Sequence, residues 1–247
     1  MKMLTEMCRL EMKSLLRFFP VVFFSLVFPS MALLLFGGMY GNEPSELFGG
    51  YGTVDVSIPS YMAIIFLNNG LMTLPLNLAA YRENKILKRF MATPLHPGVI
   101  IISQIIVNIL IMILGIFILI IVGKLVFDMK FIGSAIPMLE VCSLSALSLF
   151  ALGFVIASVS PNMRTANAAA NLIYFPMLFI SGTTIPTELM PDFMHTISKA
   201  FPATYAVTMQ KGVWLGGSLM DYKLEIAVLL AVLFAGAIIS VKTFRWE

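Results

Sequence analysis

Residues that could carry out catalysis are few and scattered in this 247-residue chain. The two histidines, His96 and His195, fall in segments that we expect on opposite sides of a membrane, so they cannot share a site. The serines at Ser143, Ser145 and Ser148 have no histidine or lysine at the same depth to activate them as nucleophiles. The sequence contains neither a GxxxxGK[ST] phosphate loop nor a clustered set of histidines and cysteines. We therefore expect no catalytic site, no metal site and no ATP bound by this chain.

Polar residues inside apolar segments offer a second kind of chemistry. Glu140 is a candidate for ion coupling, although its place near the outer end of a predicted span also fits a contact with lipid headgroups. Amide side chains recur in three segments: Asn68, Asn69 and Asn77; Gln104 and Asn108; and Asn167 and Asn171. An amide that faces lipid is costly, so each group either bonds between helices or lines a wet cavity. Bonding is the better interpretation for the second group, and both remain open for the other two.

The composition places the elements that carry these residues in a bilayer. Hydrophobic residues make up 59% of the chain and charged residues 12%, whereas soluble domains have about 25% charged residues. A spanning helix needs about 20 apolar residues. We therefore predict an all-α membrane protein with a single transmembrane domain (1–247) and no separate soluble catalytic domain. The six predicted spans cover about 19–39, 60–80, 99–122, 137–159, 165–182 and 224–241.

Three further segments complete the predicted architecture. Residues 2–17 have an amphipathic pattern that predicts an interfacial helix, which Glu11 interrupts slightly. Residues 41–59 are glycine-rich and lack Lys and Arg, so we expect an outside loop. Residues 183–214 are too apolar for a solvated loop and too short for full spans. They predict a re-entrant segment of two short helices, and a loop lying flat on the headgroups is the alternative.

The most strongly charged stretch between two spans covers residues 81–97. Its apolar residues share one face if the stretch is helical, and Pro94 and Pro97 would end that helix. The pattern predicts an amphipathic helix at 82–91 on the membrane surface, which could be a solvated connector or a contact for another protein. Lys and Arg are more frequent on the same predicted side, with 11 of the 16 there. Both termini are therefore expected in the cytoplasm of a plasma-membrane protein.

Two stretches resemble a known family. The first is Arg82-Glu83-x-x-x-Leu87-Lys88-Arg89-x-x-Ala92-Thr93-Pro94-Leu95-x-Pro97. The second is Phe175-Pro176-x-x-Phe179-x-Ser181-Gly182-x-x-x-Pro186-x-x-x-x-Pro191, followed by Phe201-Pro202-x-x-Tyr205. They are similar to the cytoplasmic loop and to the fifth span with its re-entrant segment in type-2 permeases of ATP-binding-cassette (ABC) exporters. With the six-span layout, the resemblance covers nearly the whole chain.

The resemblance implies partners and roles. Two ABC ATPase subunits would bind ATP and Mg, and a second copy or a related permease would complete the unit, in membrane lipid and without nucleic acid. Residues 82–91 would be the coupling helix that docks on the ATPase. Its contacts would be Arg82, Glu83, Leu87, Arg89 and Phe90. The chain itself would be a permease subunit and no enzyme.

The resemblance also implies a route for cargo. The second and fifth spans would line it, with Asn68, Asn69, Asn167, Asn171, Phe175 and Phe179 as path residues. The re-entrant segment would close it outside, with Ser181, Gly182, Pro186, Pro202 and Tyr205 at the gate. The expected cargo is an amphipathic or hydrophobic drug, antibiotic or lipidated peptide. A polysaccharide or glycolipid exporter is the alternative, and an ion-coupled secondary transporter is a less favoured one.

Overall fold

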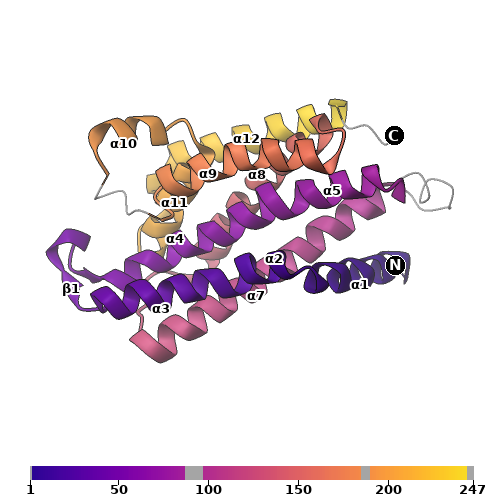
Figure 1. Cartoon of the computed structure of the whole chain (residues 1–247). Coiled ribbons are helices and arrows are strands. Elements are labelled where there is room, and N and C mark those ends of the chain that lie inside the picture. The colour runs from indigo at the N-terminus through magenta and orange to yellow at the C-terminus, as the bar shows by residue number, and fades with distance from the viewer. Residues whose placement is uncertain (1, 87–96, 185–189, 244–247) are drawn as a thin grey trace.

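The computed structural model describes residues 2–86, 97–184 and 190–243, which form a bundle of long helices running side by side (Figure 1). The N-terminal helix α1 (Lys2–Arg17) has the bounds that its amphipathic pattern predicted. It lies at the same end of the bundle as the C-terminal end of the last helix, α12 (Lys223–Thr243) (Figure 1). The described chain therefore begins and ends on one side.

The first two long helices are each built from three pieces. The first consists of α2 (Phe19–Val22), the π-helical η1 (Phe23–Val27) and α3 (Phe28–Tyr40). The second consists of α4 (Thr53–Leu67), the π-helical η3 (Asn68–Thr73) and α5 (Leu74–Glu83). Proline follows each π segment closely, at Pro29 and Pro75, where it removes a backbone donor. The two π segments contact each other, so both helices depart from regular geometry at the same place.

The remaining elements follow in order. The long helices are α7 (Pro97–Phe127), α8 (Ala135–Val159) and α9 (Met163–Ile180). The shorter ones are α10 (Asp192–Ser198), α11 (Pro202–Trp214) and the 3₁₀ turns η2 (Glu46–Phe48) and η5 (Leu219–Tyr222). Two short antiparallel strands, β1 (Pro44–Ser45) and β2 (Tyr51–Gly52), pair beside η2.

Five helices in the described ranges are long and apolar enough to cross a membrane: Phe19–Tyr40, Thr53–Glu83, Gly98–Phe127, Ala135–Val159 and Leu219–Thr243. The predicted span at 165–182 corresponds to α9, which is not among them. Arg164, Asn167 and Asn171 make its first half polar. α9 nevertheless packs against α5, η3 and α8, within the bundle.

The prediction of an outside loop at residues 41–59 is wrong in its second half. α4 begins at Thr53, and residues 54–56 and 58–59 are buried. Asn42 sets this start, because its side-chain oxygen accepts hydrogen bonds from the amides of Val54 (3.1 Å) and Asp55 (3.2 Å). Its amide nitrogen donates to the Asp55 carboxylate at 3.1 Å and to the Phe127 carbonyl at 3.2 Å. A cap supplied from outside the helix thus extends it at its N-terminus.

The second long helix is the centre of the packing. Its apolar side chains form most of the main core, together with residues of α8, α9 and α11. η3 approaches α8 so closely that a Cβ added at Gly153 would lie 1.9 Å from the Gly70 carbonyl oxygen. Glycine on both helices therefore permits backbone contact at this crossing.

Candidate translocation site

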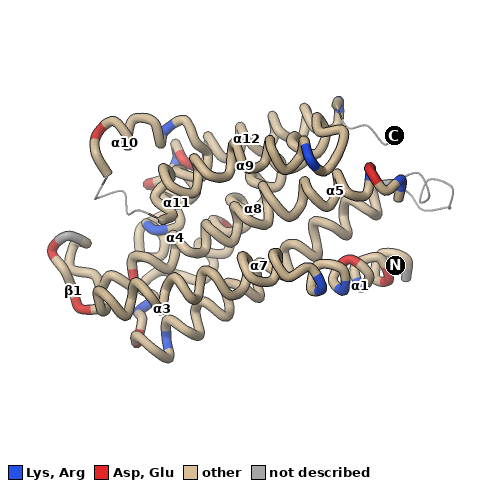
Figure 2. Tube along the Cα trace, in the orientation of Figure 1, with Lys and Arg blue, Asp and Glu red and all other residues tan. Residues whose placement is uncertain are grey.

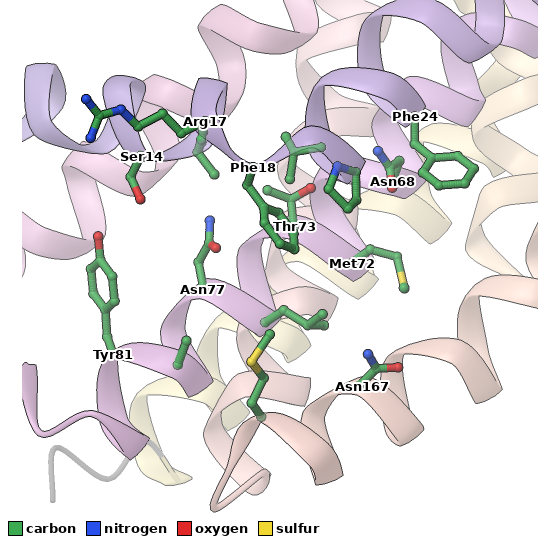
Figure 3. Close-up of a pocket in the computed structure, with 16 residues that line it drawn as sticks. Ser14, Arg17, Phe18, Phe24, Asn68, Met72, Thr73, Asn77, Tyr81 and Asn167 are labelled. Carbon is green, nitrogen blue, oxygen red and sulfur yellow. The ribbon is translucent and has the colours of Figure 1, made fainter.

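A cavity of about 570 Å³ lies between the end of α1, the start of the first long helix, η3 with α5, and the start of α9 (Figure 3). Its wall is mainly apolar, with side chains such as Phe18, Phe24 and Met72. Its polar side chains are Ser14, Arg17, Asn68, Thr73, Asn77, Tyr81 and Asn167. A cavity of this size with few polar groups is typical of sites for small amphipathic molecules.

Charge is confined to one rim of the cavity. Among the described residues that line it, Arg17 alone has a formal charge, and it lies near Ser14 at the end of α1 (Figure 3). The amide nitrogen of Asn77 is buried and has no hydrogen-bond partner among the described residues.

The two asparagines of η3 play different parts. Asn68 lines the cavity, and its amide nitrogen donates to the Ser25 hydroxyl at 3.0 Å. Asn69 is fully buried and donates to the same hydroxyl at 3.2 Å and to the Ile65 carbonyl at 2.8 Å. Of the predicted path residues, the cavity thus brings together Asn68 and Asn167. Asn69 does not line the cavity and instead forms a hydrogen bond between η3 and η1.

The other predicted path residues continue along α9. Asn167, Asn171, Phe175 and Phe179 recur every four residues, which places them on one face. The two phenylalanines are 50% and 47% exposed, and the Asn171 amide donates to the Asn167 carbonyl at 2.9 Å. This face, which extends from the cavity to the opposite end of α9, is not covered by the described chain.

The predicted coupling residues begin inside a spanning helix. Arg82 and Glu83 form the last turn of α5, and Lys85 follows in a left-handed conformation (φ 56°). The Arg82 guanidinium donates to the carbonyls of Ala157 (2.9 Å) and Ser160 (2.5 Å). Leu87, Arg89 and Phe90 lie outside the described residues.

Glu83 joins the same end of α5 to α9. Its carboxylate accepts a hydrogen bond from the Met163 amide at 2.8 Å, at the N-terminus of α9, where a negative charge is favourable. Asn162 caps this helix with a reciprocal bond to Thr165. α5 is therefore bonded to both sides of the α8–α9 turn.

The predicted gate residues lie at the opposite end of α9. Ser181 is fully buried, and its hydroxyl has no partner among the described residues. Gly182 has a φ of 82°, a left-handed conformation that favours glycine. Pro202 is the first residue of α11, and the Tyr205 hydroxyl donates to the Lys199 carbonyl at 2.8 Å. Pro186 lies outside the described residues.

Two buried acids were missed by the sequence reasoning, and the one it considered is exposed. Glu140 lies on the surface of α8, so a contact with lipid headgroups remains the better interpretation. Asp55 is 5% exposed and also accepts from the Lys130 amide at 2.8 Å. Glu11 is 1% exposed and accepts from the Tyr81 hydroxyl at 2.7 Å. Its interruption of an amphipathic pattern was the available signal for Glu11.

Comparison with known proteins gives a consistent family. Residues 4–213 match the family model described as ABC-2 type transporter. The chain is 38% identical over 82 residues to Protein SNQ2 of Saccharomyces cerevisiae, covering 33% of this chain and 6% of that protein. It is 24% identical over 107 residues to Nodulation protein J of Rhizobium leguminosarum bv. viciae, covering 43% and 41%.

A third relative is the probable multidrug ABC transporter permease YbhS of Escherichia coli K12, 22% identical over 163 residues, which cover 66% of this chain and 43% of that protein. The chain thus spans less than half the length of each of these three relatives. The family model, however, matches far more than half of the chain. The chain is therefore a multi-pass membrane protein that belongs to the ABC-2 type transporter family, as a permease subunit.

Proposed function

We propose that this permease is the membrane subunit of an ATP-driven exporter for an amphipathic or hydrophobic compound, such as a drug, an antibiotic or a lipidated peptide. The observation that carries the proposal is the cavity of about 570 Å³, with apolar walls, amide groups at Asn68, Asn77 and Asn167, and a cation at its rim. Such a wall favours a molecule with one polar end. A glycolipid is the second candidate cargo, because it also has an apolar part.

The route for the cargo follows α9, which we propose as the fifth of six spans. The face at Asn167, Asn171, Phe175 and Phe179 leads away from the cavity, and the described residues leave it largely uncovered. A second copy of the chain, or a related permease, would cover it and complete the path. Ser181, Gly182, Pro186, Pro202 and Tyr205 would form the gate at the far end.

The energy would come from two ABC ATPase subunits that bind ATP and Mg. The segment with Leu87, Arg89 and Phe90 would dock on the ATPase, directly after Arg82 and Glu83. The bonds of Arg82 to Ala157 and Ser160 support a joint movement of α5 and the α8–α9 turn. ATP can shift the permease only as far as it binds one conformation better than the other.

The orientation follows from the basic residues. Figure 2 shows the charged residues mostly at the two ends of the bundle, with basic residues of α1, α5 and α12 at the same end. We propose that this end faces the cytoplasm, with both termini, because Lys and Arg are enriched in cytoplasmic loops. The proposed ATPase would then contact the permease at this cytoplasmic end.

The test begins with the assembly. The tagged chain is expressed in its host, solubilised, and examined for a co-purifying ABC ATPase with ATP hydrolysis. We expect co-purification, and its loss when residues 82–90 are scrambled. A chain that purifies without an ATPase under several conditions would contradict the proposal.

Transport is then measured as ATP-dependent uptake of an amphipathic dye into inside-out vesicles. Phe90→Ala should keep ATP hydrolysis and lose dye uptake. Asn68→Leu and Asn167→Leu should reduce uptake several-fold. The matched control is Leu172→Ala, which changes a residue of α9 that is 77% exposed and lies outside the cavity wall. Equal uptake by the cavity variants and the control would argue against this path.

A further inference from the structure

Glu11 is unlike the other charged residues of α1. Glu6, Arg9, Lys13 and Arg17 are exposed, whereas Glu11 is 1% exposed and faces the bundle. It lies between two apolar contacts of the same helix, which Met7 and Leu15 make with α7 and its neighbours. An amphipathic helix that needs only an apolar face would have an apolar residue here.

The contacts of Glu11 tie α1 to two other helices. Its Oε1 accepts the hydroxyl hydrogen of Tyr81, near the end of α5, at 2.7 Å. Figure 3 shows this hydroxyl pointing toward α1. On α7, the Gln104 side chain lies close enough to influence the ionisation of Glu11. Gln104 is fully buried, and neither polar atom of its amide has a hydrogen-bond partner among the described residues.

No cation neutralises this carboxyl. No described Lys or Arg lies within 4.0 Å of it, and the titratable groups around it are Cys8 on α1 and Tyr81 on α5, while α7 presents the neutral Gln104. Burial raises the pKa of Glu11 above its ordinary value of 4.5, and the Tyr81 bond and Gln104 oppose part of the rise.

Glu11 lies one helical turn from the cavity. Ser14, Leu15, Arg17 and Phe18 form the cavity wall that α1 and its exit contribute, and Tyr81 lines the cavity from the other side. Any loosening of α1 would therefore move this wall. The carboxyl is remote from Asn68 and Asn167 in the sequence, and it is not among the residues that line the cavity.

We propose that Glu11 is a positioning residue for transport: with a bound proton it holds α1 against α5 and α7, and loss of the proton loosens α1 and the cavity wall. We call this proton-dependent attachment of α1 to α5 and α7 the latch. The effect on cargo rests on the proposed function, whereas the latch itself does not. The only chemical change is reversible protonation: the carboxylate takes one proton from water to form an O–H bond and releases it again.

The sign of the pH effect follows from the raised pKa. We call α1 seated when it is packed against α5 and α7, and released when it is not. Glu11 of the seated helix binds the proton more tightly than Glu11 of the released helix, so the proton's contribution to seating is complete below about pH 4.5. It is lost as the pH rises through the higher pKa of the seated state. Between about pH 4.5 and that higher pKa, seating of α1 should weaken by up to about tenfold per pH unit, and above it no further weakening is expected.

The test is hydrogen exchange of the α1 amides in the purified chain in lipid nanodiscs, over a range of pH, with each variant compared at equal pH. Glu11→Gln mimics the protonated form, so wild type and variant should match at low pH and wild type should lose protection several-fold as the pH rises. Glu6→Gln, an exposed acid of the same helix, should follow wild type. Superimposed curves for wild type and Glu11→Gln would overturn the latch.

Tyr81→Phe provides a second variant if Glu11→Gln does not fold. It removes a hydrogen bond that favours the charged carboxylate, so the wild-type loss of protection should move to higher pH. A purely structural role would lower protection at every pH without moving the transition, and this result would also overturn the proposal.

The dye-uptake assay separates this proposal from the proposed function. Uptake by wild type should fall relative to Glu11→Gln as the pH rises. A constant uptake ratio beside the expected exchange pattern would overturn the positioning role. No uptake by any variant, with that exchange pattern intact, would contradict the proposed function and leave the latch supported.

Discussion

Replacing Ser25 with alanine tests how the two π-helical segments are joined. The Ser25 hydroxyl is fully buried and accepts hydrogen bonds from both Asn68 (3.0 Å) and Asn69 (3.2 Å). Hydrogen bonds between membrane helices contribute about 0.6 kcal/mol on average and up to about 1.7 kcal/mol. Losing two of them should lower the free energy of unfolding by about 1–3 kcal/mol. Asn69 keeps its bond to the Ile65 carbonyl, so the effect should not exceed this range.

The assay is thermal unfolding of the purified chain, followed by a dye that reacts with the two native cysteines as they become exposed. At about 2–4 °C per kcal/mol for a chain of this size, a loss of 2 kcal/mol lowers Tm by about 4–8 °C. The control is Ser143→Ala, because this exposed hydroxyl bonds only within its own helix, to Leu139. Its effect should stay within about 0.5 kcal/mol.

A double variant makes the test specific. If the bond to Asn68 carries part of the loss, Ser25→Ala combined with Asn68→Ala should destabilise less than the sum of the single changes. Strict additivity, or a Ser25→Ala shift no larger than that of Ser143→Ala, would refute the reasoning.

Two further changes give expected outcomes in the same unfolding assay. Gly153→Ala would place a methyl group 1.9 Å from the Gly70 carbonyl oxygen and should lower the free energy of unfolding by about 1–3 kcal/mol. The control is Gly38→Ala, which should be neutral or stabilising because no atom lies within 4 Å of the added methyl group. Asn42→Ala removes four hydrogen bonds around the buried Asp55 and should cost about 2–4 kcal/mol. A change smaller than 1 kcal/mol in Gly153→Ala or Asn42→Ala would contradict the packing described here.

The sequence predicts well those features that depend on local composition. The bounds of α1, the approximate places of the five apolar spans and the two short helices before the last span follow from apolar runs and amphipathic spacing. Features that depend on distant partners were missed. The start of α4 depends on Asn42, and the burial of Glu11 depends on Tyr81, 70 residues away.

The candidate site was predicted in part for the same reason. Asn68 and Asn167 were both expected along a common path, and the cavity brings them together. Asn69 was assigned to the path with its neighbour, although it is fully buried and bonds to Ser25 and to the Ile65 carbonyl. Consecutive helical residues point about 100° apart, so two adjacent asparagines do not line the same surface. The bonds of Arg82 to two carbonyls of the α8–α9 turn could not be predicted either, since the sequence does not show which helix ends meet.

The π-helical segment η3 has a consequence for insertions and deletions. Each residue added to a helix turns everything beyond it by about 100° around the axis, because an α-helix has 3.6 residues per turn. Deleting one residue between Asn68 and Thr73 could restore an α-helix there, yet α5 would turn by that angle relative to α4. Tyr81 would leave Glu11, and Arg82 would leave the α8–α9 turn. The length of η3 thus sets the rotation of α5 relative to α4 about the axis of this span, so family members should vary in the residues of this segment more readily than in their number.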